Sequence, residues 1–182
     1  MKPAASHSRT VIELIEAGAK QLTAAGVAFG HGTANAFDEA AWLVLWQLAL
    51  PLDRLYSVQD NPVTPADQAK ILALFETRIS TRKPAAYLTH EAWLTGVPFY
   101  VDERSIVPRS FIAELLAGGA IDPWLGEHTS RVLDPCTGNG SLAVLAARTW
   151  PEVTVGGAGR SAAEPAVARI NAARHGFQGR PP

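Results

Sequence analysis

The chain has 182 residues, of which 47% are hydrophobic and 18% are charged, as is typical of a globular protein with one ordinary domain or two small ones. A formal net charge of −1 excludes an overall basic field that would attract nucleic acid. The single cysteine, Cys136, excludes an internal disulfide framework and a cysteine-rich zinc site, and no His, Cys, Asp or Glu cluster has the spacing of a metal site.

The sequence shows no targeting or membrane segment. Residues 1–6 are not followed by the apolar region of a signal peptide. The most apolar stretch, residues 40–52, contains Gln47 and is too short to cross a bilayer. We therefore expect a cytoplasmic protein.

The N-terminal part is expected to be helical. Thr10 and Glu13 match a capping box at the start of a first helix. After a glycine-punctuated segment at 26–35, a second helix is expected over about 38–50. This second helix has few polar positions, so it is expected to lie inside the helical cluster.

Two later helices are marked by their caps. Thr64 as N-cap and Pro65 at the first helical position predict a third helix that continues to about Thr81. Ser110 is expected to cap another helix that runs through Leu116 and ends at two glycines.

Short aromatic and branched runs lie between these helices. Residues 86–89, 92–94 and 98–101 are such runs around Thr95-Gly96, and they predict extended chain and a β-hairpin. The five tryptophans are expected to pack in the core or between elements; they are Trp42, Trp46, Trp93, Trp124 and Trp150.

The C-terminal part alternates between strand and helix patterns. Strands are expected at 131–134 and 153–157, and helices at 141–149 and 163–174. Such alternation predicts a parallel α/β sheet.

The strongest functional signal is the segment at residues 134–140. An apolar strand ends at Asp134, and Gly138 and Gly140 follow it before an Ala/Leu-rich helix. This order presents backbone N–H groups at a helix N-terminus to a ligand, while glycine permits close approach. The added carboxylate favours a ligand with a positive charge or an amine, such as S-adenosylmethionine. A purely structural glycine turn is the alternative.

Several motifs, taken together, resemble the bacterial glutamine methyltransferases that modify the third protein of the large ribosomal subunit. The resemblance covers roughly residues 9–176. The related release-factor methyltransferases share the hairpin and the Pro-Arg turn, but they are less similar at Gly-His-Gly-Thr and Tyr-Val-Asp-Glu-Arg. The motifs are Gly-His-Gly-Thr (30–33) with Asn35, Asp-Glu-Ala (38–40), Ala-Tyr-Leu-Thr (86–89), Phe-Tyr-Val-Asp-Glu-Arg (99–104), Val-Pro-Arg-Ser (107–110) and Asp-Pro-Cys-Thr-Gly-Asn-Gly (134–140).

The resemblance implies an α/β fold class in three parts. These are a helical substrate-recognition domain at 1–82, a β-hairpin linker at 83–110 and the first strand–helix units of a class I, Rossmann-like methyltransferase domain at 111–182. It implies transfer of a methyl group from S-adenosylmethionine to a glutamine amide of a large-subunit ribosomal protein. The cofactor-binding residues that it implies are Asp134, Cys136, Thr137, Gly138, Asn139 and Gly140.

Three further residues are candidates for substrate binding or for positioning the site. Arg109 is expected either to face the cofactor crevice or the substrate, or to form an ion pair with Asp102, Glu103 or Glu114. Ser110 follows it. His31, between two glycines, contacts a partner protein or hydrogen-bonds within its own loop. Cys136 is expected to be a small packing residue rather than a nucleophile.

The chain departs from the family pattern in two respects. It contains no Asn-Pro-Pro-Tyr, the family's catalytic signature, and only about two strand–helix units precede its end. Gly159 stands where the family has a ribose-binding aspartate. We therefore expect an N-terminal portion of the enzyme, with no catalytic residue of its own, that binds the cofactor weakly, is inactive alone and self-associates through an incomplete sheet.

Two other functions remain open at this stage. One is a non-catalytic module that binds a ribosomal protein, and the other is a relative of the release-factor methyltransferases. Neither requires direct nucleic-acid binding, in keeping with the near-neutral charge.

Overall fold

The structure is a computed structural model that describes residues 8–161 and 163–177. The chain divides into two compact units, Met1–Thr89 and His90–Pro182, each with its own core. Within the described residues, no helix is long and apolar enough to cross a membrane.

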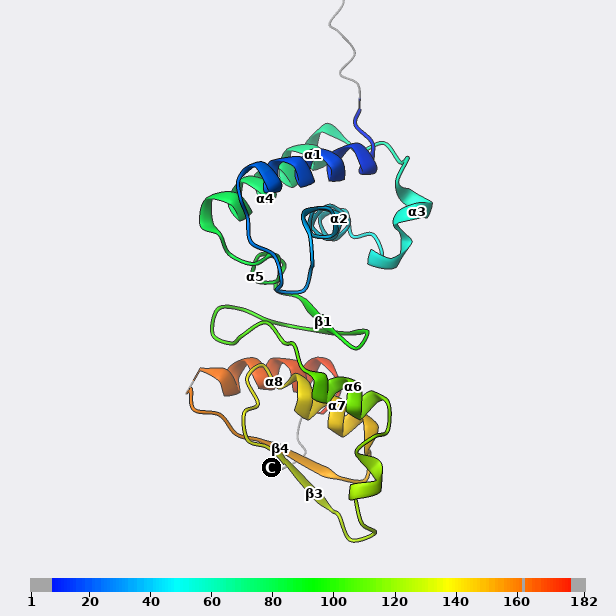
Figure 1. Cartoon of the computed structure of the whole chain (residues 1–182), viewed down its shortest axis with the longest axis vertical. Coiled ribbons are helices and arrows are strands. Elements are labelled where there is room, and N and C mark those ends of the chain that lie inside the picture. Colours follow the sequence, from blue (N-terminus) through cyan, green and yellow to red (C-terminus); the bar gives the residue numbers. More distant parts are fainter. Residues whose placement is uncertain (1–7, 162, 178–182) are drawn as a thin grey trace, which may run out of the picture. The chain divides into compact units, whose positions relative to one another are not determined.

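The first unit is helical (Figure 1). Its central helix, α2, packs against both α1 and α4. Its elements are α1 (Val11–Ala24), α2 (Ala36–Gln47), the 3₁₀ turn η1 (Leu52–Arg54), α3 (Leu55–Val58), α4 (Pro65–Thr81) and α5 (Ala85–Thr89).

The expected helix starts in this unit are confirmed. The Thr10 hydroxyl accepts a hydrogen bond from the Glu13 amide at 3.4 Å, and the Glu13 carboxylate accepts one from the Thr10 amide at 2.8 Å. The Thr64 hydroxyl likewise accepts from the Asp67 amide at 3.2 Å, and Pro65 is the first residue of α4. These bonds satisfy amides that have no partner inside their helices.

The prediction of extended chain at 86–89 is wrong, because these residues belong to α5. Pro84 precedes the helix and its carbonyl accepts from the Tyr87 amide at 3.0 Å. Ala85 and Ala86 are fully buried, so their strong helix propensity and small size win over the aromatic and branched side chains that follow.

The second unit has an α/β composition (Figure 1). It begins with the expected hairpin, in which Ala92 pairs with Phe99 and Leu94 with Val97. Its elements are β1 (Ala92–Leu94), β2 (Val97–Phe99), α6 (Phe111–Ala117), the 3₁₀ turn η2 (Asp122–Trp124), β3 (Arg131–Asp134), α7 (Ser141–Thr149), β4 (Thr154–Gly157) and α8 (Glu164–Arg174).

Strands β3 and β4 form the expected parallel pair, from Arg131 opposite Thr154 to Asp134 opposite Gly157. Helices α7 and α8 lie on the same side of this pair (Figure 1). On β3, Leu133 is 64% exposed. The fold class is therefore mixed α/β, with two separate two-stranded sheets among the described residues.

The core of this unit joins the hairpin to the helices. Phe99 is fully buried, and helices α6 and α7 pack against each other. The buried members of this core are Phe99, Ala113, Leu116, Val144, Leu145 and Ala146.

The expectation of packing is wrong for two tryptophans. Trp93 is 46% exposed and Trp124 is 85% exposed. Along β1, Ala92 points into the core, and since side chains alternate along a strand, Trp93 points outward. Trp124 ends a short 3₁₀ turn that buries none of its residues.

Candidate functional site

The candidate site is the turn that joins β3 to α7. Backbone hydrogen bonds tie this turn to the end of β4: the Ala158 amide donates to the Asp134 carbonyl at 2.8 Å, and the Thr137 amide donates to the Ala158 carbonyl at 2.8 Å. The carboxyl ends of two neighbouring parallel strands therefore meet the start of a helix, which is where open α/β sheets place their ligands.

Two glycines are required by the backbone of this turn. Gly138 has a φ of 49° and Gly140 a φ of 81°, in the left-handed region that favours glycine. A Cβ on Gly140 would also lie 3.0 Å from both Cα and Cβ of Ala168 in α8. Gly140 is thus the residue that lets α7 begin close to α8.

Two polar atoms at the site are buried and find no hydrogen-bond partner among the residues that the structure describes. They are Oδ2 of Asp134 and Oγ1 of Thr137. The other oxygen of Asp134 accepts from the Cys136 amide at 3.3 Å. Because a buried polar atom without a partner costs free energy, such atoms indicate a place where a ligand supplies the missing bond.

The start of α7 also has free capacity for a ligand. Gly140 is its N-cap and has no side chain to accept from the first-turn amides. The Asn139 side chain accepts only from the Ser141 amide, at 3.2 Å. Amides at a helix N-terminus attract carboxylate and other oxygen groups.

A buried asparagine of α8 holds the turn in place. Asn171 is fully buried, and its side-chain amide donates to the carbonyls of Asn139 at 2.8 Å and Tyr100 at 2.9 Å. Its oxygen accepts from the Tyr100 amide at 2.7 Å. One side chain therefore links α8, the glycine turn and the segment after β2.

The segment after β2 also contains a polar cluster formed by Tyr100, Asp102 and Arg104. The Tyr100 hydroxyl donates to Asp102 at 2.8 Å, and the Arg104 guanidinium donates to the same carboxylate at 3.0 Å. The hydrogen bonds from Arg104 hold the pKa of Asp102 well below its usual value, whereas the bond to Asp102 raises the pKa of the Tyr100 hydroxyl. The carboxylate therefore stays ionised and keeps this segment anchored.

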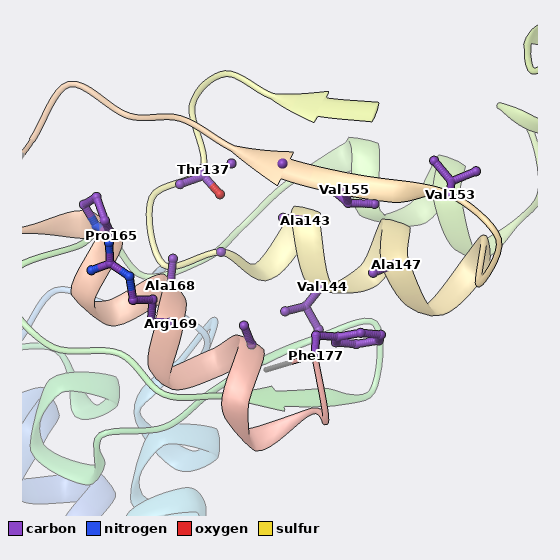
Figure 2. Close-up of a pocket in the computed structure, with 14 residues that line it drawn as sticks. Thr137, Ala143, Val144, Ala147, Val153, Val155, Pro165, Ala168, Arg169 and Phe177 are labelled. Atoms are coloured by element: carbon purple, nitrogen blue, oxygen red, sulfur yellow. The ribbon is translucent and has the colours of Figure 1, made fainter. Parts of the chain in front are cut away.

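A cavity of about 410 Å³ lies between β4, α7 and α8. Figure 2 shows Ala143, Ala147 and Ala168 on its helical walls and Thr137 at its upper end. The lining is mainly apolar, with Gly156 and Gly157 on the strand side. Small residues on facing elements leave this space open.

The other predicted site residues occupy different places. Arg109 is exposed and makes no ion pair within the described residues, while Asp102, one expected partner, is paired with Arg104. Ser110 caps α6, because its hydroxyl accepts from the Ile112 amide at 3.1 Å. Cys136 is exposed. Across the described chain, no group of three or more His, Cys, Asp and Glu side chains is placed to hold a metal ion.

His31 lies in the helical unit and is exposed. Hydrogen bonds from helices α2 and α4 support its loop. The Thr33 hydroxyl donates to Glu39 of α2 at 3.0 Å, and Arg78 of α4 donates to the other oxygen of Glu39 at 2.7 Å. Both charged side chains are at most 3% exposed. The loop that presents His31 thus rests on a buried ion pair.

Sequence reasoning missed the supporting residues of both units. Glu39 lies in α2 and Asn171 in α8, and neither was among the predicted site residues. The available signal for Glu39 was its place in a helix with few other polar residues; Asn171 offered no such signal, because its three bonds reach across 32 to 71 residues.

Curated proteins of known name are similar to this chain over nearly its whole length. A curated relative from Burkholderia pseudomallei, named ribosomal protein uL3 glutamine methyltransferase, is 47% identical over 174 residues, which is 94% of this chain and 56% of the relative. Proteins of the same name from Bordetella pertussis and Neisseria meningitidis serogroup B are 47% and 42% identical, over 94% and 97% of this chain and 58% and 59% of their own length. No protein-family model matches the chain.

The chain therefore spans a little over half the length of these curated relatives. Identity above 40% over nearly the whole chain confirms the resemblance found in its motifs. The chain is a homologue of the proteins named ribosomal protein uL3 glutamine methyltransferase.

Proposed function

We propose that the turn at residues 134–140 binds S-adenosylmethionine and that the chain serves methylation of a glutamine side chain in ribosomal protein uL3. The observation that carries this proposal is the buried Oδ2 of Asp134, which has no partner where β3 ends against the start of α7. The names of the homologues support the same reading, since they state the reaction and the protein that is modified.

The residues present fit such a cofactor. The carboxylate of Asp134 suits the amino group of the methionine part, because charge-assisted hydrogen bonds to an ionised acceptor are short and strong. The turn from Cys136 to Gly140 offers backbone amides at close range, and its glycines leave room for a ligand to approach. This part of the chain would belong to a class I, Rossmann-like methyltransferase domain.

The chemistry divides between cofactor and protein. The cofactor, when bound, supplies a methyl group on a positively charged sulfur. The protein's part is to hold it in one orientation, to which Asp134 and the Asn171-supported turn contribute. The substrate amide needs its own acceptors, which the family's Asn-Pro-Pro-Tyr supplies and this sequence lacks. We therefore propose that these 182 residues bind the cofactor but do not transfer the methyl group by themselves.

The helical segment at 1–82 would recognise the substrate protein. Its loop at 30–33 presents His31 to solvent and is braced by Glu39 and Arg78, so it offers a rigid, exposed surface. A rigid loop loses little conformational entropy on binding.

Isothermal titration of the 182-residue chain with S-adenosylmethionine tests the cofactor site. We expect measurable binding that Asp134→Asn weakens about tenfold or more, since a hydrogen bond to a charged group contributes ~1.5–3 kcal/mol. Asp53→Asn, which removes an exposed carboxylate in the helical unit, is the charge-matched control and should bind as the unaltered chain does. Binding that is unchanged by Asp134→Asn would contradict the assignment of this turn.

A second assay tests whether the chain binds uL3 without methylating it. The chain is incubated with purified uL3 and radiolabelled S-adenosylmethionine, with a full-length homologue as positive control. We expect no label in uL3 from the chain alone, and co-purification of uL3 with it. Transfer of label at the rate of the homologue would refute the proposal that the chain is inactive alone.

A further inference from the structure

Gly159 occupies the position where a ribose-binding acid is expected, but another side chain fills the space beside it. A Cβ placed on Gly159 would lie 2.6 Å from Oε2 of Glu164 and 3.8 Å from its Cδ. In an aspartate, the carboxylate oxygens lie at a similar distance from the Cβ of the same residue. The Glu164 oxygen is therefore about as close to position 159 as the oxygens of an aspartate there would be. A carboxylate is present at this point, and it comes from α8 rather than from the strand end.

Glu164 is available to a ligand. It is the first residue of α8, where the helix dipole favours the ionised carboxylate. It is half-buried, and within the described residues it makes no hydrogen bond or ion pair. Gly159 does not have a left-handed backbone, so what distinguishes glycine there is the room it leaves for Glu164.

The surroundings provide an independent indication of a ligand. Thr137 is 7% exposed and its hydroxyl has no partner. This hydroxyl lies at the same end of β4, because a Cβ on Gly157 would be 2.7 Å from it. Asp134, with its own partnerless buried oxygen, is joined to this strand end through Ala158. Polar groups from three segments, each without a partner among the described residues, are thus tied to the end of β4 between positions 157 and 159.

We propose that Glu164 supplies the carboxylate that binds the two ribose hydroxyls of the adenosyl cofactor, in place of an acid at position 159. This inference rests on the proposed function. A carboxylate with two free oxygens can accept from both hydroxyls of a cis-diol at once. The glycine at 159 is then an adaptation to an acid that has moved to the following helix, and the site retains its ribose-binding group.

Paired variants test this exchange by isothermal titration with S-adenosylmethionine. Glu164→Ala should weaken binding about tenfold or more. Gly159→Asp alone should also weaken binding, because its carboxylate would collide with that of Glu164 and repel it. Gly159→Asp combined with Glu164→Ala should restore most of the affinity, since one acid again occupies the place. A purely helix-capping role for Glu164 predicts no such rescue.

The controls separate this inference from the proposed function. Glu152→Gln, an exposed carboxylate in the same unit, should leave affinity unchanged, and circular dichroism should show equal helix content in all variants. If Asp134→Asn abolishes binding while every Glu164 and Gly159 variant binds like the unaltered chain, the cofactor site stands and the role of Glu164 is refuted. If the unaltered chain shows no binding, both are refuted.

Discussion

The helical unit and the α/β unit differ in the side chains that lie between their elements. In the helical unit, Phe75, Leu43 and Ile71 are fully buried, and a buried ion pair joins α2 to α4. In the α/β unit, a cavity of about 410 Å³ separates β4 from α7 and α8, and alanines and glycines line much of it. A buried ion pair therefore supports the exposed loop of the first unit, whereas hydrogen bonds from the neutral side chain of Asn171 hold the glycine turn of the second.

The largest expected effect comes from breaking the ion pair of the helical unit. Arg78→Met leaves the carboxylate of Glu39 buried without its partner, which costs about 3–5 kcal/mol. Hydrogen exchange followed by mass spectrometry should show the loss in peptides from residues 8–89. The double variant Glu39→Leu with Arg78→Met should recover much of it, because no buried charge remains. Equal losses in the single and double variants would mean that packing, not charge, holds these helices.

The corresponding break in the α/β unit is smaller. Asn171→Ala removes three hydrogen bonds and takes these partners from the Tyr100 amide and the Asn139 carbonyl, at a cost of about 1–3 kcal/mol. Urea denaturation of the chain measures this loss of stability. Hydrogen exchange in peptides from 131–177 shows whether it falls in the α/β unit. Asn171→Asp keeps the acceptor for the Tyr100 amide but places a buried carboxylate oxygen against the carbonyls of Tyr100 and Asn139, so it should destabilise the unit at least as much as Asn171→Ala. An unaffected exchange rate in the glycine turn would contradict the supporting role of Asn171.

Adding side-chain volume should stabilise the α/β unit and destabilise the helical unit. Ala172→Leu extends an apolar side chain into the cavity and should stabilise the α/β unit by about 1 kcal/mol. Gly18→Ala in α1 places a Cβ 2.1 Å from the buried ring of Phe75. Overpacking costs ~1–3 kcal/mol, which outweighs the gain in helix propensity. Urea midpoints of the two variants check both signs, and stabilisation by both would erase the contrast between the units.

The smallest effect is a dependence on pH. Hydrogen bonds from Arg104 lower the pKa of Asp102 from its ordinary value of 3.8, so the folded state favours the ionised carboxylate. This contribution is present above the unfolded pKa and is lost as the pH falls below it. Asp102→Asn should therefore destabilise the α/β unit by ~1 kcal/mol near neutral pH, because Arg104 is partly exposed, and by less at about pH 3. Denaturation midpoints at the two pH values measure the difference, and a pH-independent loss would exclude the charge as its cause.

Local signals predicted most of the helices and strands. Capping residues such as Thr10 and Thr64 act within three residues, so their helices begin where the sequence indicates. The strand at 154–157 forms in spite of its two glycines, because pairing with β3 overrides a weak local preference. The helix at 85–89 was missed because small buried alanines, rather than the aromatic pattern, decide its conformation.

The candidate site could be located from the sequence but not completed. The spacing of Asp134, Gly138 and Gly140 marks the turn, and the positive φ of both glycines fits a turn that requires glycine. Asn171, which supports the turn, is distant from it in sequence and belongs to no recognisable pattern.

The sequence by itself determined the order of helices and strands, the glycine turn and the similarity to uL3 glutamine methyltransferases, because these depend on neighbouring residues and on inherited motifs. Only the tertiary structure decided that Glu39 meets Arg78, that Asn171 holds the turn and that a carboxylate reaches the vacant side of Gly159. Burial and hydrogen bonding between distant segments arise when the chain packs, and no local pattern of residues encodes them.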